Sequence, residues 1–371
     1  IRGWYLEGAM LFKGAIEQMI QHPECHEIGS RSAVALAALQ IHYAEFLHRL
    51  SSFDEARHYL DAAMPFVRAH QRSAEIGFAL NALGYNWYMR GDYQAAQAPY
   101  QEALAIFRQT RHFAGIATVL NNLGNVFAAQ DESGSYQGAQ RCYEESLQVA
   151  RASGNQQEIA RALLNLGTIA HVHHEYLNAR FYYEESIQSA REIDSRRNLA
   201  IALSNLGDVY IQTNDLTAAQ SHLLEALSLK RKLGDQRSAA YTLNILSDVY
   251  LKLGDRAHAH SSCLEALRTA LAVKALPVAC ETMLQLASLL LGVGEQKIAF
   301  KLALIILHHP APEESAKKHA HTLLTQLPTV VNDNIVNEEE IKFLQHRAKI
   351  DDLKALLDPL IQQIPAILAV A

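Results

Sequence analysis

Small residues recur along the chain with a fixed spacing inside helical stretches of apolar residues. The clearest copies read Ala-Leu-Gly or Asn-Leu-Gly, and each copy centres on one small residue that we call the anchor. The step between anchors is 40 residues, except that it is 43 between Gly124 and Gly167, where we place three extra residues in a turn at 131–134. The seven anchors are Ala44, Gly84, Gly124, Gly167, Gly207, Ser247 and Ala287. A repeat of this length indicates a solenoid built from stacked supersecondary units.

Each repeat predicts two helices. A second small residue follows most anchors after 12 residues and a third after seven more, with Ile306 as the exception in the last repeat. Gly-Asp or Asn-Asp pairs such as Gly91-Asp92 lie between the two apolar segments, where Gly ends one helix and Asp caps the next. Two antiparallel helices approach closely only where the facing side chains are small. The sequence therefore predicts an all-α solenoid of about seven helical hairpins.

Composition narrows the possible functions. The 371 residues include 49% hydrophobic and 19% charged residues with a net charge of −6, which is typical of a folded domain without a basic nucleic-acid-binding surface. The four cysteines form no CxxC pair, so we expect no disulfide framework or zinc site and a cytoplasmic location. No apolar run is long enough to span a membrane. Nucleotide-binding, hydrolase and metalloprotease motifs do not occur, so we expect no enzyme activity and no cofactor.

Eighteen histidines raise the question of a metal site. His171 and His174 are one helical turn apart, but no cluster of converging ligands repeats along the array. We therefore predict solvated surface histidines and no bound metal.

The repeat resembles the tetratricopeptide repeat over residues 1–307, in the 40-residue form found in kinesin light chains and Pins-type adaptors. The resemblance implies a right-handed superhelix in which the first helix of each hairpin lines the concave side. Segments such as Leu163-Leu164-Asn165-Leu166-Gly167 also resemble the C-terminal arrays of bacterial transcriptional regulators of the signal-transducing ATPase class.

The two ends of the chain suggest further organisation. Residues 3–15 align with the second helix of a repeat, so we expect a half repeat at the N-terminus and a fragment cut from a longer protein. After residue 307 the repeat stops, and residues 308–371 are predicted to form a helical cap, with helices at 313–327 and after Asn337. A homodimer contact and a segment folded into the array's own groove are the alternatives for this tail.

A polar stripe runs along the predicted first helices, at positions three and two before each anchor and one and four after it. Asparagine offers both a donor and an acceptor, so a series of asparagines at repeat spacing suits the capture of an extended peptide. The resemblance carries peptide binding onto Asn122, Asn125, Asn165 and Asn205, and a groove-arginine role onto Arg161, six residues before its anchor. The stripe begins with His42, Glu45 and His48, includes Tyr88 and His171, and continues to Gln285 and Ser288. We predict that the ligand-binding residues are Asn81, Tyr85, Asn121, Asn122, Asn125, Arg161, Asn165, Thr168, Asn205, Asp208, Asn244 and Asp248.

Structural roles compete with this interpretation. An asparagine beside the anchor can instead bond between neighbouring repeats and only support stacking. Tyr100, Tyr143 and Tyr183 occupy matched second-helix positions, and we predict that they pack between helices. For the whole protein, the first hypothesis is a ligand-sensing or interaction region of a larger bacterial signalling protein that binds a protein or peptide. The second is a passive scaffold that joins two proteins.

Overall fold

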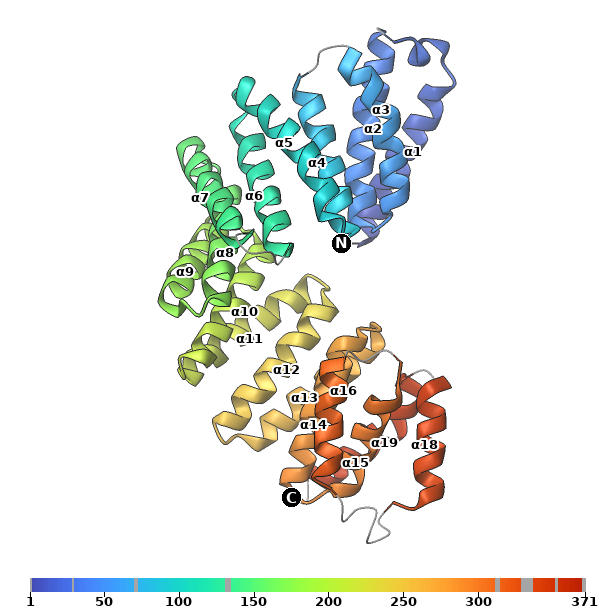
Figure 1. The fold of residues 1–371 in the computed structure, drawn as a ribbon, viewed down its shortest axis with the longest axis vertical. Helices are drawn as coiled ribbons and strands as arrows, with labels where there is room; N and C mark the ends of the chain where they lie inside the picture. The colour runs from blue at the N-terminus through green and yellow to red at the C-terminus, as the bar shows by residue number, and fades with distance from the viewer. Residues whose placement is uncertain are drawn as a thin grey trace. The chain divides into compact units, whose positions relative to one another are not determined.

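The computed structural model of this chain describes residues 2–28, 30–69, 73–130, 135–310, 314–327, 336–350 and 353–368. All regular elements in these residues are helices, and the chain divides into two compact units (Figure 1). We call Ile1–Ala202 the N-terminal unit and Leu203–Ala371 the C-terminal unit.

The N-terminal unit begins with a single helix, and helical hairpins follow. Helix α1 packs on α2, as expected for the second helix of a half repeat. Its helices are α1 (Arg2–Ile20), η1 (Pro23–His26), α2 (Arg31–Arg49), α3 (Phe53–Ala69), α4 (Ser73–Met89), α5 (Tyr93–Gln109), α6 (Phe113–Ala129), α7 (Ser135–Ser153), α8 (Gln156–Val172) and α9 (Tyr176–Glu192).

The C-terminal unit continues the hairpins and adds the tail helices. Helix α10 starts in the N-terminal unit and ends in this one. The helices are α10 (Arg196–Gln212), α11 (Leu216–Lys232), α12 (Gln236–Lys252), α13 (Arg256–Ala272), α14 (Leu276–Gly292), α15 (Gln296–His308), α16 (Glu314–Thr325), α18 (Glu338–Ile350) and α19 (Leu353–Leu368). The seven predicted hairpins, α2–α3 through α14–α15, are thereby confirmed.

Glycine and aspartate residues mark the ends and starts of these helices, as the sequence predicted. In the Gly91-Asp92 turn, Gly91 has a left-handed φ of 80°, and the Asp92 carboxylate accepts a hydrogen bond from the backbone N–H of Ala95 at 2.9 Å. Asp215 and Asp255 cap their helices in the same way. The predicted turn at 131–134 lies outside the described residues.

The four glycine anchors allow close helix packing, because each faces a side chain from the second helix of its own hairpin. A Cβ atom on Gly84 would lie 2.7 Å from Cδ1 of Tyr100, and one on Gly167 would lie 2.6 Å from Cδ1 of Tyr183. Real Cβ contacts are not this short, so the glycine leaves the space that the aromatic ring fills. The ring would have to move if the anchor carried a side chain.

Within each unit, the first helices of successive hairpins lie next to one another. Contacts join α2 with α4, α4 with α6 and α6 with α8 in the N-terminal unit, and α12 with α14 and α14 with α16 in the C-terminal unit. Side chains on this face, here called the first-helix face, can therefore form a continuous surface across repeats.

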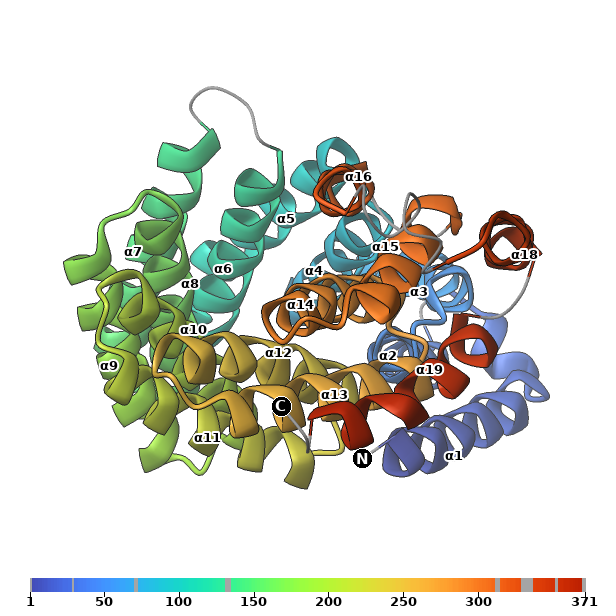
Figure 2. The same ribbon diagram turned by 90° about the horizontal axis from the view of Figure 1, so that it is seen from below.

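The tail packs on the end of the array. Helix α18 contacts α15, α19 contacts α13, and Leu357 and Ile364 are fully buried in the core of the C-terminal unit (Figure 2). Lys301 forms an ion pair with Glu340, and Asn337 caps α18 by accepting from the Glu340 N–H at 2.8 Å, as predicted. Residues 311–313, 328–335, 351–352 and 369–371 of the tail lie outside the described residues.

Candidate functional site

Four asparagines of the polar stripe form bonded pairs across neighbouring repeats of the N-terminal unit. Nδ2 of Asn122 on α6 donates to Oδ1 of Asn81 on α4 at 2.8 Å. Nδ2 of Asn165 on α8 donates to Oδ1 of Asn125 on α6 at 3.4 Å. All four side chains are half-buried. The first-helix face therefore carries these amides side by side, as the sequence predicted.

In each of these four side-chain amides, either the Nδ2 donor or the Oδ1 acceptor has no hydrogen-bond partner among the described residues. Within the described residues, the Nδ2 groups of Asn81 and Asn125 have no acceptor, and the Oδ1 atoms of Asn122 and Asn165 have no donor. Unused donors and acceptors thus occur together along the same face. An extended peptide backbone presents alternating C=O and N–H groups of this kind.

Tyrosine hydroxyls from the second helices contact residues of the polar stripe. The hydroxyl of Tyr143 donates to Oδ1 of Asn125 at 2.7 Å, and that of Tyr183 contacts Oγ1 of Thr168 at 3.4 Å. Tyr100, Tyr143 and Tyr183 are at most 3% exposed, and burial raises the pKa of the Tyr143 hydroxyl above its ordinary value. The prediction that these three tyrosines pack between helices is confirmed.

Asn121 is not available to a ligand, contrary to its place in the predicted stripe. Its side chain is 0% exposed, and Nδ2 donates to Ser146 at 2.7 Å and to Glu158 at 3.2 Å. Its Oδ1 accepts from Asn165 at 3.2 Å. Asn121 therefore joins neighbouring repeats, which is the structural alternative for an asparagine at this position.

Tyr85 and Arg161 lie on the stripe but contact side chains of the protein itself. The ring of Tyr85 meets the ring of His48 edge to face, with 5.1 Å between centroids. Arg161 pairs with the Glu158 carboxylate at 2.7 Å and donates to the Thr118 carbonyl at 3.3 Å. An acidic ligand group would have to share Arg161 with Glu158.

The stripe continues in the C-terminal unit with different chemistry. Asn205, Asp208, Asn244 and Asp248 are all half-buried. Oδ1 of Asn244 is buried and has no hydrogen-bond partner among the described residues, and Asp248 pairs with Lys252 at 2.9 Å. These residues do not form the amide pairs seen in the N-terminal unit.

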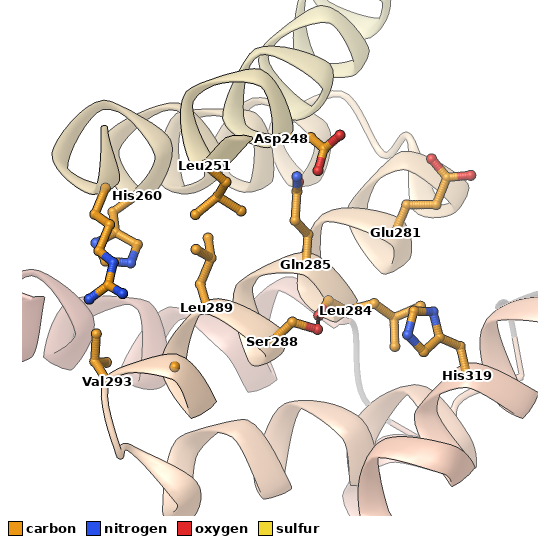
Figure 3. A pocket seen from close by; sticks show the side chains of 12 residues that line it. Asp248, Leu251, His260, Glu281, Leu284, Gln285, Ser288, Leu289, Val293 and His319 are labelled. Atoms are coloured by element: carbon orange, nitrogen blue, oxygen red, sulfur yellow. Dashed lines mark hydrogen bonds between the residues drawn. The ribbon is translucent and has the colours of Figure 1, made fainter. Parts of the chain in front are cut away.

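A pocket of about 480 Å³ lies in the C-terminal unit, between α12, α13, α14 and α16 (Figure 3). A volume of this size suits a small molecule or a few peptide residues. Leu251 and Leu289 lie in its centre, His260 lies on one side, and Glu281 and His319 lie on the other. The pocket is lined by Asp248, Leu251, Arg256, His260, Glu281, Leu284, Gln285, Ser288, Leu289, Gly292, Val293 and His319.

Only part of this pocket was predicted from the sequence. Asp248 belongs to the predicted stripe and Gln285 and Ser288 to its extension, but Arg256 and His260 were missed because they lie at the start of a second helix. The signal that could have found them is their spacing, since residues four apart share a helix face. Burial and the nearby Arg256 charge lower the pKa of His260.

The described residues contain neither a cluster of metal ligands nor a membrane-spanning helix. Among the described residues, no three His, Cys, Asp or Glu side chains converge in a way that could hold a metal ion. Within that same part of the chain, no helix is long and apolar enough to cross a membrane.

Comparison with known proteins identifies the repeat. Two family models are both described as tetratricopeptide repeat: one matches residues 115–192 and 198–272, and the other matches residues 79–110. No curated protein matches the sequence.

Three solved structures illustrate the fold that this chain shares with known proteins. The quorum sensor NprR from B. thuringiensis, in its apo form, aligns at a TM-score of 0.63 with 15% identity, over 94% of this chain and 97% of that one. A STAND protein with a tetratricopeptide repeat sensor from Pyrococcus horikoshii aligns at 0.58 with 15% identity, over 85% of this chain. BtubC (BKLC) from P. vanneervenii aligns at 0.51 with 22% identity, over 64% of this chain and 92% of that one.

The match to the STAND protein is partial, because the chain spans 46% of its length. At these identities the three likenesses establish the fold. The family-model matches, the 40-residue spacing and the anchor packing agree, and the chain contains an array of tetratricopeptide repeats.

Proposed function

We propose that this chain is a non-catalytic binding module whose first-helix face captures an extended peptide or a peptide segment of a partner protein. The proposal rests on the side-chain amides of Asn81, Asn122, Asn125 and Asn165. Each has either an Nδ2 donor or an Oδ1 acceptor without a partner among the described residues. Two bonded pairs hold these amides in place, so a ligand would order few side chains on binding. Thr168 extends the proposed surface within the N-terminal unit, and Asn205, Asp208 and Asn244 form a separate candidate surface in the C-terminal unit.

The module belongs, in this proposal, to a larger bacterial signalling or transcriptional regulator of the cytoplasm. The likeness to a quorum sensor and to a tetratricopeptide repeat sensor supports a sensing role. The four cysteines form no disulfide, which supports a reducing compartment. A sensor requires that the ligand bind two conformations of the array with different affinity.

The binding surface can be tested on the full chain with peptides selected from a random display library. Binding of each selected peptide is measured by calorimetry for the parent and for an Asn122→Ala/Asn165→Ala double variant. Two lost hydrogen bonds of about 1 kcal/mol each predict binding that is about 30-fold weaker. Asn178→Ala, an exposed asparagine on α9, is the matched control and should bind as the parent does. Equal affinity of parent and double variant would rule the surface out.

Sensing and passive scaffolding can then be separated. Hydrogen exchange of the full chain is compared with and without a selected peptide. A sensor should show changed protection in helices that do not touch the peptide, whereas a scaffold should change only at the contact surface.

A further inference from the structure

Ion pairs join the second helices of neighbouring repeats at matched positions. In the first of them, Nη2 of Arg68 on α3 contacts Oε1 of Glu102 on α5 at 2.8 Å. The other pairs repeat this arrangement, because each arginine lies in the last turn of its helix and its glutamate follows 34 or 37 residues later. We call these pairs the Arg–Glu ladder: Arg68–Glu102, Arg108–Glu145 and Arg151–Glu185 in the N-terminal unit, and Arg231–Glu265 in the C-terminal unit.

Long side chains are needed to join the second helices, because the backbones of these helices lie apart. Close backbone contacts link α4 with α6 and α6 with α8, but among the described residues no comparable contact links α5 with α7 or α7 with α9. A pocket of about 420 Å³ lies between α7 and α9, with Leu166 of α8 and Arg151 in its lining. Arg151 reaches Glu185 on α9 at 2.7 Å. The second helices therefore have space to move relative to one another, and the ion pairs span that space.

The matched positions are apolar at two other places along the chain. Leu271 and Ile305 occupy them on α13 and α15, where both side chains are buried in the core of the C-terminal unit. Ile20 and Ala62 occupy them on α1 and α3. Apolar side chains carry no charge for salt to screen, whereas each ladder side chain is 37% to 55% exposed and its charge is screened by ions in solution. Between α3 and α9, the links between second helices are therefore sensitive to salt.

We infer that the Arg–Glu ladder sets the spacing of the second helices, and with it the curvature of the N-terminal unit, through an attraction that salt weakens. Bending of the stack about the first-helix contacts moves the second helices apart or together. A single exposed ion pair contributes little, but the three pairs of this unit oppose the same motion and their effects add.

The ladder lies on the second helices and is independent of the asparagines of the first-helix face. It acts whether or not a ligand binds there. A ligand that changes the spacing of the first helices has to work against the ladder, so the ladder contributes to the free-energy difference between two curvatures.

The test measures the distance between spin labels on α3 and α9 of the full chain by pulsed electron paramagnetic resonance. The labels are attached at His58→Cys and Gln188→Cys, which are exposed positions of these helices. Cys142→Ser removes the half-buried native cysteine, and the other three native cysteines are buried and should not be labelled: Cys25, Cys263 and Cys280. In this labelled parent, salt of about 1 M shortens the Debye length to about 3 Å and should lengthen the mean distance relative to low salt.

A charge reversal at the middle pair should have a larger effect than salt. Arg108→Glu places two carboxylates where Arg108 now attracts Glu145, so α5 and α7 should move apart. At low salt, the mean label distance should lengthen and its distribution should widen about twofold. The exchange variant Arg108→Glu/Glu145→Arg restores opposite charges and should return the distance to that of the labelled parent.

A matched control separates the ladder from a general effect of charge. Arg180 pairs with Glu184 of its own helix, so Arg180→Glu makes the same change of charge without breaking a ladder pair and should leave the distance unchanged. Three results would overturn the inference: an unchanged or shorter distance in Arg108→Glu, an altered distance that persists in the exchange variant, or a distance in the labelled parent that does not depend on salt.

Discussion

The two units share one repeat but differ in the residue that faces several of the anchors. In the N-terminal unit, tyrosines fill the space beside Gly84, Gly124 and Gly167. In the C-terminal unit, Leu223 fills the space beside Gly207, and Cys263 lies beside Ser247. Of tyrosine, leucine and cysteine, only tyrosine has a hydroxyl group, and this hydroxyl reaches the first-helix face.

This difference decides how the first-helix face is held. Tyrosine hydroxyls contact Asn125 and Thr168 in the N-terminal unit, whereas Asp248 pairs with Lys252 in the C-terminal unit. The N-terminal unit therefore presents a row of side-chain amides that hydrogen bonds hold in place. The C-terminal unit presents a pocket with unpaired polar groups. The same repeat thus presents two different polar surfaces in the two units.

The largest expected effect comes from adding a side chain to an anchor in the N-terminal unit. In Gly167→Ala, the new Cβ would lie 2.6 Å from the Tyr183 ring, so unfolding free energy should fall by about 2 to 3 kcal/mol despite the better helix propensity of alanine. Chemical denaturation measures this change. Gly14→Ala, where no atom lies within 4 Å of the added Cβ, should instead be neutral or slightly stabilising. Equal effects of the two variants would contradict the anchor packing.

The C-terminal unit should gain stability when its buried lysine is removed. Lys230 is 6% exposed, it donates to Ser204 and Thr242 at 2.6 and 2.7 Å, and burial lowers its pKa to about 8. The matched positions of other repeats hold apolar residues such as Val67 and Phe107. Lys230→Met should therefore raise the unfolding free energy by about 2 kcal/mol at pH 7.

The pH dependence checks this interpretation of Lys230. Because the pKa is lower in the folded state, the lysine's contribution to stability is lowest below pH 8 and recovers as the pH rises toward 10.5. The advantage of Lys230→Met over the parent should shrink between pH 7.5 and pH 9.5. A constant difference would mean that the lysine is not penalised by burial.

The N-terminal unit should lose stability in acid because of one buried histidine. His48 is 8% exposed, its Nε2 is 3.3 Å from Nδ2 of Asn86, and burial lowers its pKa to about 4. Its contribution is fully present above pH 6.5 and is lost as the pH falls toward 4, so about 1 to 2 kcal/mol should disappear by pH 4.5. His48→Gln should flatten this dependence, and the exposed His58→Gln should not.

The smallest expected effect tests the link between tyrosine and stripe. Tyr143→Phe removes the hydroxyl that donates to Asn125 and should cost about 1 kcal/mol of unfolding free energy. Tyr100 fills the equivalent space beside Gly84, but its hydroxyl has no hydrogen-bond partner among the described residues. Tyr100→Phe should therefore be close to neutral. An unchanged unfolding free energy in Tyr143→Phe would show that ring packing, and not the hydroxyl, holds the stripe.

Much of the fold could be predicted from local sequence chemistry. The 40-residue spacing, the Gly-Asp turns and the small anchors predicted each hairpin, because helix ends and close packing depend on residues near one another in the chain. The stripe positions followed from helical periodicity, which places Asn81, Asn122 and Asn165 on one face.

Only the tertiary structure decided which stripe residues remain available and where the pocket lies. Asn121 and Asn122 are neighbours in sequence, yet Asn121 is enclosed by Ser146 and Glu158 of the adjoining helices while Asn122 is half-buried. Periodicity assigns a residue to a face but not the depth to which the neighbouring repeat covers it. The pocket around His260 needs side chains from four helices, and their convergence depends on packing between repeats that no single segment encodes.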